Sequence, residues 1–144
     1  MARQLLIGSA LVIATVFVHA LATSLLLPTL RRLQPGSWKP RGRLTEMNIV
    51  AILVLLLFLT AVVEVALWAV VYVQVGALVG FEEALYFSMV TFTTLGYGEI
   101  VLMERWRLLA SFEAATGIIM FGWTTAIILA AIQRIVRGQD ASES

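Results

Sequence analysis

The chain has 144 residues, of which 60% are hydrophobic and only 13% charged, and its net charge is +1 at neutral pH. A soluble domain has roughly a quarter of its residues charged, so this composition excludes an ordinary soluble domain and indicates a membrane protein. The absence of cysteine excludes disulfide bonds and thiolate metal sites. The few basic residues mostly flank apolar runs, so no nucleic-acid partner is expected.

Three apolar segments are long enough to cross a bilayer, at residues 5–27, 49–73 and 108–132. Each exceeds the ~20 residues that a helix needs to cross the hydrocarbon layer. We therefore expect an all-α membrane protein with an N-terminal transmembrane helix within residues 1–30. The other two helices would belong to a second unit, residues 49–134.

The first apolar segment also has features of a signal peptide. Arg3 precedes it, and Ala20 and Ala22 resemble a small-residue cleavage site. The apolar run nevertheless continues past that site to Leu27, which favours a membrane helix that is retained.

A basic linker, residues 31–48, separates the first two spans. Its cations are Arg31, Arg32, Lys39, Arg41 and Arg43. The positive-inside rule places this linker in the cytoplasm and the N-terminus outside. Arg134 and Arg137 follow the third span, so the tail, residues 135–144, is expected to be short and cytoplasmic. The linker cations would also suit anionic lipid head groups, although setting the topology is sufficient reason for them.

A shorter apolar segment, residues 82–93, lies between the second and third spans. As a helix it would measure only ~18 Å, which is too short to cross the membrane. It is therefore predicted to be a re-entrant or interfacial helix on the outer side. Glu82 and Glu83 in its first turn would complement the positive end of its dipole, and its negative end would favour a cation in mid-membrane.

The sequence Thr94-Leu95-Gly96-Tyr97-Gly98 follows this short helix. Glycine tolerates backbone conformations that let successive carbonyl groups face one side. A row of carbonyl oxygens can replace the water shell of a monovalent cation, and the Thr94 hydroxyl would add a further ligand. Leu95 and Tyr97 would then point away from the ion path and wedge the segment in place.

The stretch from Thr93 to Glu99, TTLGYGE, resembles the selectivity filter of potassium channels, whose usual form is TTVGYGD. The order of membrane helix, pore helix, filter and membrane helix over residues 49–134 is also similar to that family. The resemblance implies a homotetramer, in which each chain joins three identical subunits around a pore. It implies K⁺ binding at Thr94, Leu95, Gly96 and Tyr97, and no cofactor beyond the permeant ion. The brevity of the chain suggests a prokaryotic plasma (inner) membrane.

The chain departs from the family pattern at several positions near the filter. Leu95 replaces valine or isoleucine, Glu99 replaces aspartate, and Val90 stands where many relatives have an acidic residue. The aromatic pair of the pore helix is Tyr86-Phe87 instead of two tryptophans. These departures bear on how the filter is supported. The candidate supporting residues are Thr93, Val90 and Glu99.

Three ionisable residues lie within the spans: His19, Glu64 and Glu113. Such residues are candidates for function. Glu64 and Glu113 are predicted to lie at similar depth and to share a hydrogen-bond network behind the filter, with one carboxyl protonated. The alternative for each is an ordinary buried polar residue at a helix contact. His19 is interpreted as a packing residue or as a pH sensor.

Gly117 and Gly122 lie in the third span and allow two interpretations. Glycine can loosen a helix and so serve as the hinge of an inner gate. Small residues also allow close helix packing in membranes.

The function expected from these features is passive, potassium-selective conduction. The alternatives are a non-conducting regulatory subunit that keeps the pore fold, and a weakly selective cation channel. An enzyme or carrier built on His19, Glu64 and Glu113 is disfavoured, because no nucleophile–base or metal-ligand spacing accompanies them. No segment has the regular arginines of a voltage sensor.

Overall fold

The computed structural model describes residues 1–31 and 43–143, and all regular structure in these ranges is helical. The helices are α1 (Ala2–Arg31), α2 (Arg43–Gln74), α3 (Phe81–Phe92), the 3₁₀ turn η1 (Glu104–Trp106) and α4 (Arg107–Glu143). The five cations expected to meet lipid head groups, Arg31, Arg32, Lys39, Arg41 and Arg43, lie outside the residues whose side chains the structure describes.

The segments Ala2–Leu26, Leu44–Gln74 and Glu104–Arg137 are long and apolar enough to cross a membrane, which confirms the predicted all-α membrane fold. All three long helices extend beyond the expected apolar runs, and for α2 and α4 this changes the expected boundaries. Helix α2 begins at Arg43, so the basic linker ends before residue 48. Helix α4 continues to Glu143, so the polar tail up to that residue is helical. Nothing in residues 43–48 breaks a helix, and Glu46 in the first turn favours one.

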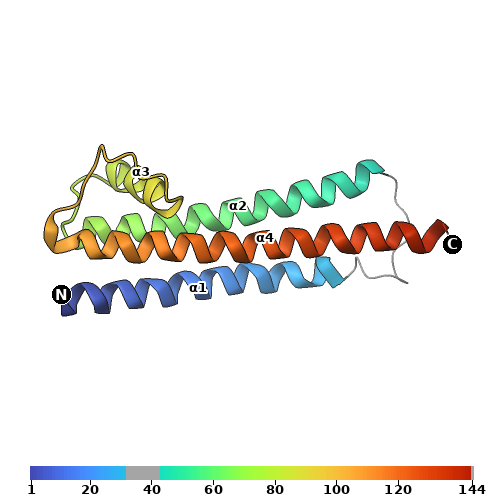
Figure 1. The fold of residues 1–144 in the computed structure, drawn as a ribbon, viewed down its shortest axis with the longest axis horizontal. Coiled ribbons are helices and arrows are strands. Elements are labelled where there is room, and N and C mark those ends of the chain that lie inside the picture. The colour runs from blue at the N-terminus through green and yellow to red at the C-terminus, as the bar shows by residue number, and fades with distance from the viewer. Residues whose placement is uncertain (32–42, 144) are drawn as a thin grey trace.

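The three long helices run side by side, and the short α3 lies at one end of the bundle (Figure 1). The N-terminus is at the same end as α3, whereas the C-terminus is at the opposite end. Helix α3 has 12 residues, so its length is ~18 Å and it cannot cross the bilayer alone. This arrangement agrees with the short re-entrant helix expected from the sequence.

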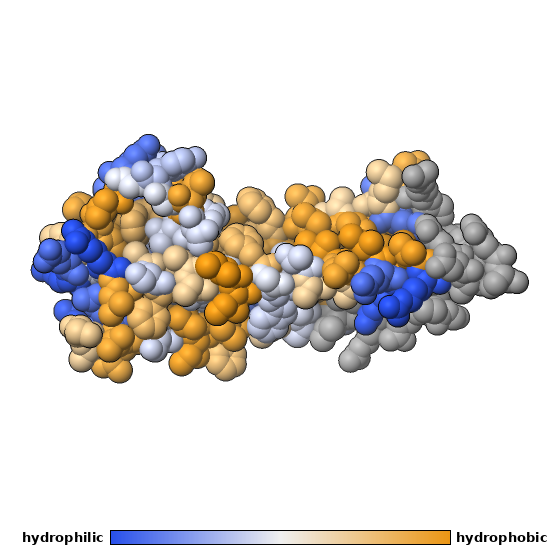
Figure 2. All heavy atoms as spheres, viewed as in Figure 1, coloured by the Kyte–Doolittle hydropathy of each residue, from blue (hydrophilic) through white to orange (hydrophobic). Residues whose placement is uncertain are grey.

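Two apolar clusters form the core. The larger, at the α3 end, includes Trp68, Tyr72, Phe87 and Leu109. The smaller joins α2 and α4 farther along and consists of Leu53, Leu57, Ile127, Ala131 and Ile135. Trp123 of α4 packs against both clusters. Outside these clusters much of the surface is apolar, with hydrophilic residues toward the two ends (Figure 2), as expected for helices that face lipid or other chains.

Helix α1 is packed against the other two long helices along much of its length. Near its start, the guanidinium of Arg3 lies 5.5 Å from the ring centre of Trp106. At Gly8, an added Cβ would lie 3.0 Å from the Phe112 ring, so the absence of a side chain allows α1 and α4 to approach closely. Farther along, the indole nitrogen of Trp68 donates a hydrogen bond of 3.1 Å to the Thr15 hydroxyl. Helix α1 is therefore an integral part of the bundle.

A tight turn after α2 directs the chain toward α3. Gly76 has φ +69°, and its N–H donates to the Val73 carbonyl while that of Ala77 donates to the Tyr72 carbonyl. This pair of bonds is the Schellman motif, which satisfies the last carbonyls of a helix and favours glycine at its left-handed position.

Helix α4 passes very close to the end of α3 at Gly117. A Cβ atom at this position would lie 1.9 Å from the backbone oxygen of Phe92. By contrast, a Cβ at Gly122 would meet no atom within 4 Å. Both glycines lie within the continuous helix α4. The structure therefore favours the packing interpretation for Gly117 and leaves room for a bend at Gly122.

This difference predicts opposite effects for two alanine substitutions. Gly117→Ala should destabilise the protein by about 1–3 kcal/mol or more, because the methyl group forces α3 and α4 apart. Gly122→Ala should be neutral or stabilising by up to about 1 kcal/mol, since alanine favours a helix. The difference is measured by heating the two variants in detergent and monitoring the folded fraction by size-exclusion chromatography. Equal midpoints would contradict this description of the α3–α4 contact.

Candidate functional site

The segment that follows α3 folds back onto the last turn of that helix. The N–H groups of Leu95 and Gly96 both donate to the carbonyl of Val90, at 2.9 and 3.2 Å, and the N–H of Thr94 donates to Thr91 at 2.9 Å. The Thr93 hydroxyl donates to the Met89 carbonyl at 2.7 Å. Val90 thus contacts the segment through its backbone oxygen, and Thr93 closes the end of the helix.

The backbone of this segment alternates in conformation. Thr94, Gly96 and Gly98 have φ angles of +59°, +56° and +80°, whereas Leu95 and Tyr97 between them do not have positive φ. Glycine adopts such values at little cost. For the β-branched Thr94 the cost is about 1–3 kcal/mol, a strain often found at functional sites. When residues with positive and negative φ alternate, successive peptide groups point in a similar direction. Polar groups of one kind can then gather on one side of the segment.

Every residue from Thr93 to Glu99 is exposed in the single chain. Leu95 is 56% exposed and Tyr97 63%, although both have large apolar side chains. The sequence predicts that these two side chains wedge the segment in place, and within one chain they are not enclosed. Only a further molecule could cover them and complete the surroundings of the segment.

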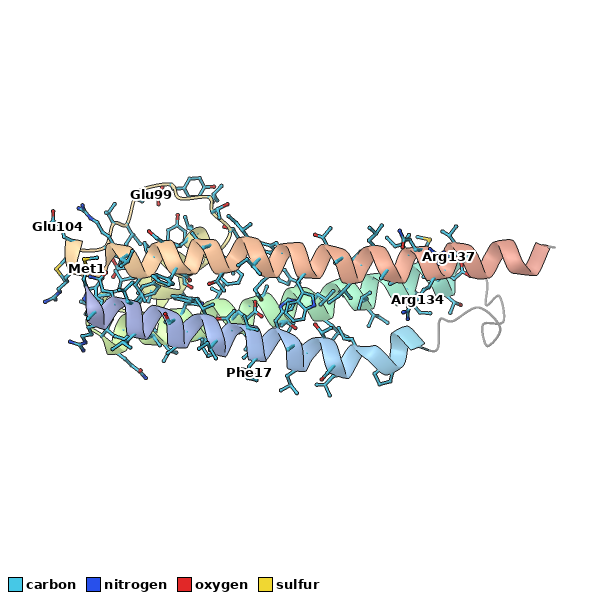
Figure 3. All side chains as sticks on the ribbon, turned by 60° about the horizontal axis from the view of Figure 1, so that its bottom comes forward. Met1, Phe17, Glu99, Glu104, Arg134 and Arg137 are labelled. Atoms are coloured by element: carbon cyan, nitrogen blue, oxygen red, sulfur yellow. The ribbon has the colours of Figure 1, made fainter. Side chains whose placement is uncertain are left out.

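Just after the segment, Glu99 is connected to α3 by a hydrogen bond. The Tyr86 hydroxyl donates a hydrogen bond of 2.9 Å to Glu99 Oε2. Figure 3 shows Glu99 on the loop beside α4, at the same end of the molecule as Met1 and Glu104. The hydrogen bond to Glu99 raises the pKa of the Tyr86 phenol above its ordinary value, and desolvation and the charge of Glu99 act in the same direction.

Behind α3, one buried carboxyl group joins three helices. Glu113 of α4 is fully buried. The Tyr72 hydroxyl of α2 donates a hydrogen bond of 2.6 Å to its Oε2, and Ser88 Oγ of α3 is hydrogen-bonded to its Oε1. Ser88 Oγ also lies 2.8 Å from the carbonyl oxygen of Val65 on α2. Glu113 therefore fixes α3 between the two helices that flank it.

The number of available protons favours a neutral carboxyl at Glu113. Ser88 has a single hydroxyl proton, but both the Val65 carbonyl and the Glu113 carboxyl lie within hydrogen-bond distance of it. If Glu113 donates a proton to Ser88, then Ser88 can donate to Val65, and Tyr72 can donate to the other oxygen of Glu113. Every group in this network is then satisfied, and no charge is buried.

The prediction that Glu64 and Glu113 share one network is wrong. Glu64 is hydrogen-bonded instead to His19 of α1, with 2.9 Å between Oε1 and Nδ1. Glu113 is bonded to Tyr72, which lies eight positions after Glu64 on α2 and so ~12 Å farther along it. Tyr72 and Ser88 were not among the predicted site residues, because only the packing of α2 and α3 shows that they face Glu113.

In a comparison with protein-family models, residues 49–134 match a family described as an ion channel. The match includes most of α2, all of α3 and the loop after it, and α4 as far as Arg134, but not α1. Searches of curated proteins and of solved structures found no significant match.

The bond from Tyr86 to Glu99 predicts a late titration of this phenol. Since its pKa is raised, the hydrogen bond is intact below the ordinary tyrosine pKa of about 10 and is lost only as the pH rises through the higher value. The difference in phenolate absorbance between the wild type and Tyr86→Phe should therefore have a midpoint above 10. The same titration in Glu99→Gln serves as the control and should return the midpoint toward 10. A wild-type midpoint at 10 would contradict the bond.

The network around Glu113 predicts that glutamine can replace the acid and that leucine cannot. In Glu113→Gln, the amide oxygen accepts from Tyr72 and the amide nitrogen donates to Ser88. In Glu113→Leu, Ser88 can still donate to the Val65 carbonyl, but the Tyr72 hydroxyl loses its partner, at a cost of about 1–3 kcal/mol for this unsatisfied buried group. Thermal unfolding midpoints should be near wild type for the glutamine variant and clearly lower for the leucine variant. A leucine variant as stable as the glutamine variant would show that the network does not hold α3.

Proposed function

Because the chain belongs to the ion channel family that matches residues 49–134, we propose that it is the subunit of a potassium-selective channel that conducts K⁺ passively. The observation that carries this proposal is the exposed segment Thr94–Gly98, with its alternating backbone, at the end of a helix too short to cross the membrane.

Potassium selectivity is inferred from the kind of ligand this segment offers. Among the described residues, no backbone N–H donates to the carbonyl oxygens of Thr94–Tyr97, so these oxygens are available to an ion. Carbonyl oxygens from Thr94, Leu95, Gly96 and Tyr97, with the Thr94 hydroxyl, would replace the water around K⁺. The last turn of α3 would add the negative end of its helix dipole near the same point.

The segment of one chain can contact an ion from one side only. The proposal therefore requires a closed ring of chains around the ion. A homotetramer would place four such segments around an axis, with α4 lining the path below them. It would also cover the exposed Leu95 and Tyr97, and apolar side chains of α4 such as Ile118 and Ile119, which are 62% and 59% exposed.

The groups behind the segment are proposed to keep it in position. Glu113, with Ser88 and Tyr72, fixes the body of α3. The Tyr86–Glu99 bond holds the outer end of the segment, and the Val90 carbonyl holds the inner end. These contacts hold the proposed filter at both of its ends.

For the orientation, we propose that the α3 end faces outward across a plasma (inner) membrane. Arg134 and Arg137 of α4 lie at the end opposite Glu99, Glu104 and Met1 (Figure 3). The positive-inside rule then places the C-terminus in the cytoplasm and the N-terminus outside.

Ion flux from proteoliposomes tests the proposal. Purified protein in liposomes loaded with K⁺ should release K⁺, with valinomycin as the positive control, and should not support a comparable Na⁺ flux. Gly96→Ala should abolish the flux, because an L side chain is strained at φ +56°. Gly80→Ala is a matched control. Gly80 has an extended backbone with ample space around it, so this variant should conduct like wild type.

The remaining outcomes separate the alternatives. Equal fluxes of Na⁺ and K⁺ would retain a pore but replace the selective channel with a weakly selective cation channel. Absence of flux from correctly assembled protein would favour a non-conducting regulatory subunit. Flux that persists in Gly96→Ala would show that this segment is not the filter.

A further inference from the structure

His19 and Glu64 form a buried polar pair between α1 and α2. Nδ1 of His19 lies 2.9 Å from Oε1 of Glu64, and the side chains are 1% and 0% exposed. Nε2 of His19 and Oε2 of Glu64 are also buried, and neither has a hydrogen-bond partner among the residues that the structure describes. Ionisable groups within a membrane span are costly to bury, so an incompletely satisfied pair calls for a functional reason.

The pair is in direct contact with α4 through Trp123. The ring centres of His19 and Trp123 are 5.1 Å apart. Trp123 also packs against both apolar clusters of the core, the one around α3 and the one between α2 and α4. Any movement of α4 at this level therefore changes the contact between Trp123 and His19.

Helix α4 is fixed to α2 and α3 on the side of Trp123 that is nearer α3, and it has open space directly beside Trp123. Glu113 is bonded to α2 and α3, and Gly117 lies against the Phe92 carbonyl. The next glycine along α4 is Gly122, directly before Trp123, and it has open space where a side chain would be. Since glycine loosens a helix, Gly122 is the first position after the fixed part of α4 at which the helix can bend.

We propose that His19 and Glu64 form a proton-binding site through which α1 controls the bending of α4 at Gly122. The proposal rests on the proposed function in one respect: bending of α4 affects conduction only if this helix lines the pore. It assigns a role to α1, which lies outside the matched ion channel region.

The proton dependence follows from the charge of the buried pair. With one proton shared between imidazole and carboxylate, the pair has no net charge. Loss of that proton leaves an anion in the helix interface, and uptake of a second leaves a cation, and both are unfavourable in a medium of low polarity. Histidine is the side chain whose charge changes most readily near neutral pH. Either change leaves an uncompensated buried charge, so the pair separates when it gains or loses a proton, and the contact between His19 and Trp123 is released.

No other titratable group described on the three helices lies near the pair. The nearest on α2 is Tyr72, eight residues after Glu64, and the nearest on α4 is Glu113, ten residues before Trp123. These separations correspond to ~12 and ~15 Å along the helices. Tyr72 and Glu113 are moreover bonded to each other. The proton response at this level is therefore assigned to His19 and Glu64 alone.

The neighbouring contact between α1 and α2 provides a matched control. Thr15 lies four residues before His19, Trp68 lies four residues after Glu64, and the two are joined by a hydrogen bond of 3.1 Å. Trp68→Phe removes a polar contact from the same interface, one turn away, without removing a group that titrates.

Potassium flux from proteoliposomes, with the pH equal on both sides and varied from about 5 to about 8, tests the regulatory role. The wild-type flux should change by about fivefold or more over this range, the lower end of typical coupling between sites. His19→Gln and Glu64→Gln should each flatten this dependence, and Trp68→Phe should keep it. A flat wild-type profile, or an undiminished profile in both glutamine variants, would overturn the proposal.

Tryptophan fluorescence of the purified protein tests the proton site without requiring conduction. A protonated imidazole quenches an adjacent indole, so the emission that is lost in Trp123→Phe should vary with pH in the wild type. This variation should disappear in His19→Gln. If it is absent in the wild type, the site does not bind a proton in this range and the proposal fails.

The two measurements distinguish failure of this proposal from failure of the proposed function. Absence of flux at every pH contradicts the channel and with it the control of conduction, while fluorescence still decides whether the pair binds a proton. Flux that is independent of pH, together with fluorescence that titrates, overturns the regulatory role and leaves the channel intact.

Discussion

The buried carboxyl group of Glu113 is the contact on which the position of α3 depends. Helix α3 has 12 residues and ends inside the molecule, so it cannot be fixed by crossing the membrane. Hydrogen bonds to Tyr72 and Ser88 connect Glu113 to α2 and α3, and Gly117, one turn farther along α4, allows the backbone of α4 to reach the Phe92 carbonyl. The segment from Thr94 to Gly98 starts from this fixed end, and its first N–H groups bind back to α3.

Membrane helices gain little from the hydrophobic effect when they associate, so polar contacts and close packing determine their arrangement. The bundle uses both along α1. Gly8 allows α1 to approach Phe112, Trp68 donates to Thr15, and His19 binds Glu64. These contacts connect α1 to the same helices that hold α3. An N-terminal helix outside the matched region is therefore in a position to influence the proposed pore.

The sequence was sufficient to predict the features that depend on local composition. Length and apolarity identified the three spans, the short run before TTLGYGE identified α3, and two glycines around Tyr97 indicated an unusual backbone. Which side chains meet across the bundle depends on helix rotation and depth, which the sequence does not define. The sequence therefore suggests Glu113 as the partner of Glu64, whereas the structure pairs Glu64 with His19, and no pattern in the sequence indicates the left-handed backbone of Thr94. Likewise, the difference between Gly117 and Gly122 is visible only where α3 meets α4.

The central claim, a pore that selects K⁺ by backbone oxygens, is tested most directly by a reversal potential. Single channels would be recorded in a planar bilayer with K⁺ on one side and an equal concentration of Na⁺ on the other. The account predicts a reversal potential displaced far from zero, in the direction that shows K⁺ carries the current. A reversal potential near zero would show that Na⁺ and K⁺ pass equally, and would contradict the role assigned to the segment Thr94–Gly98.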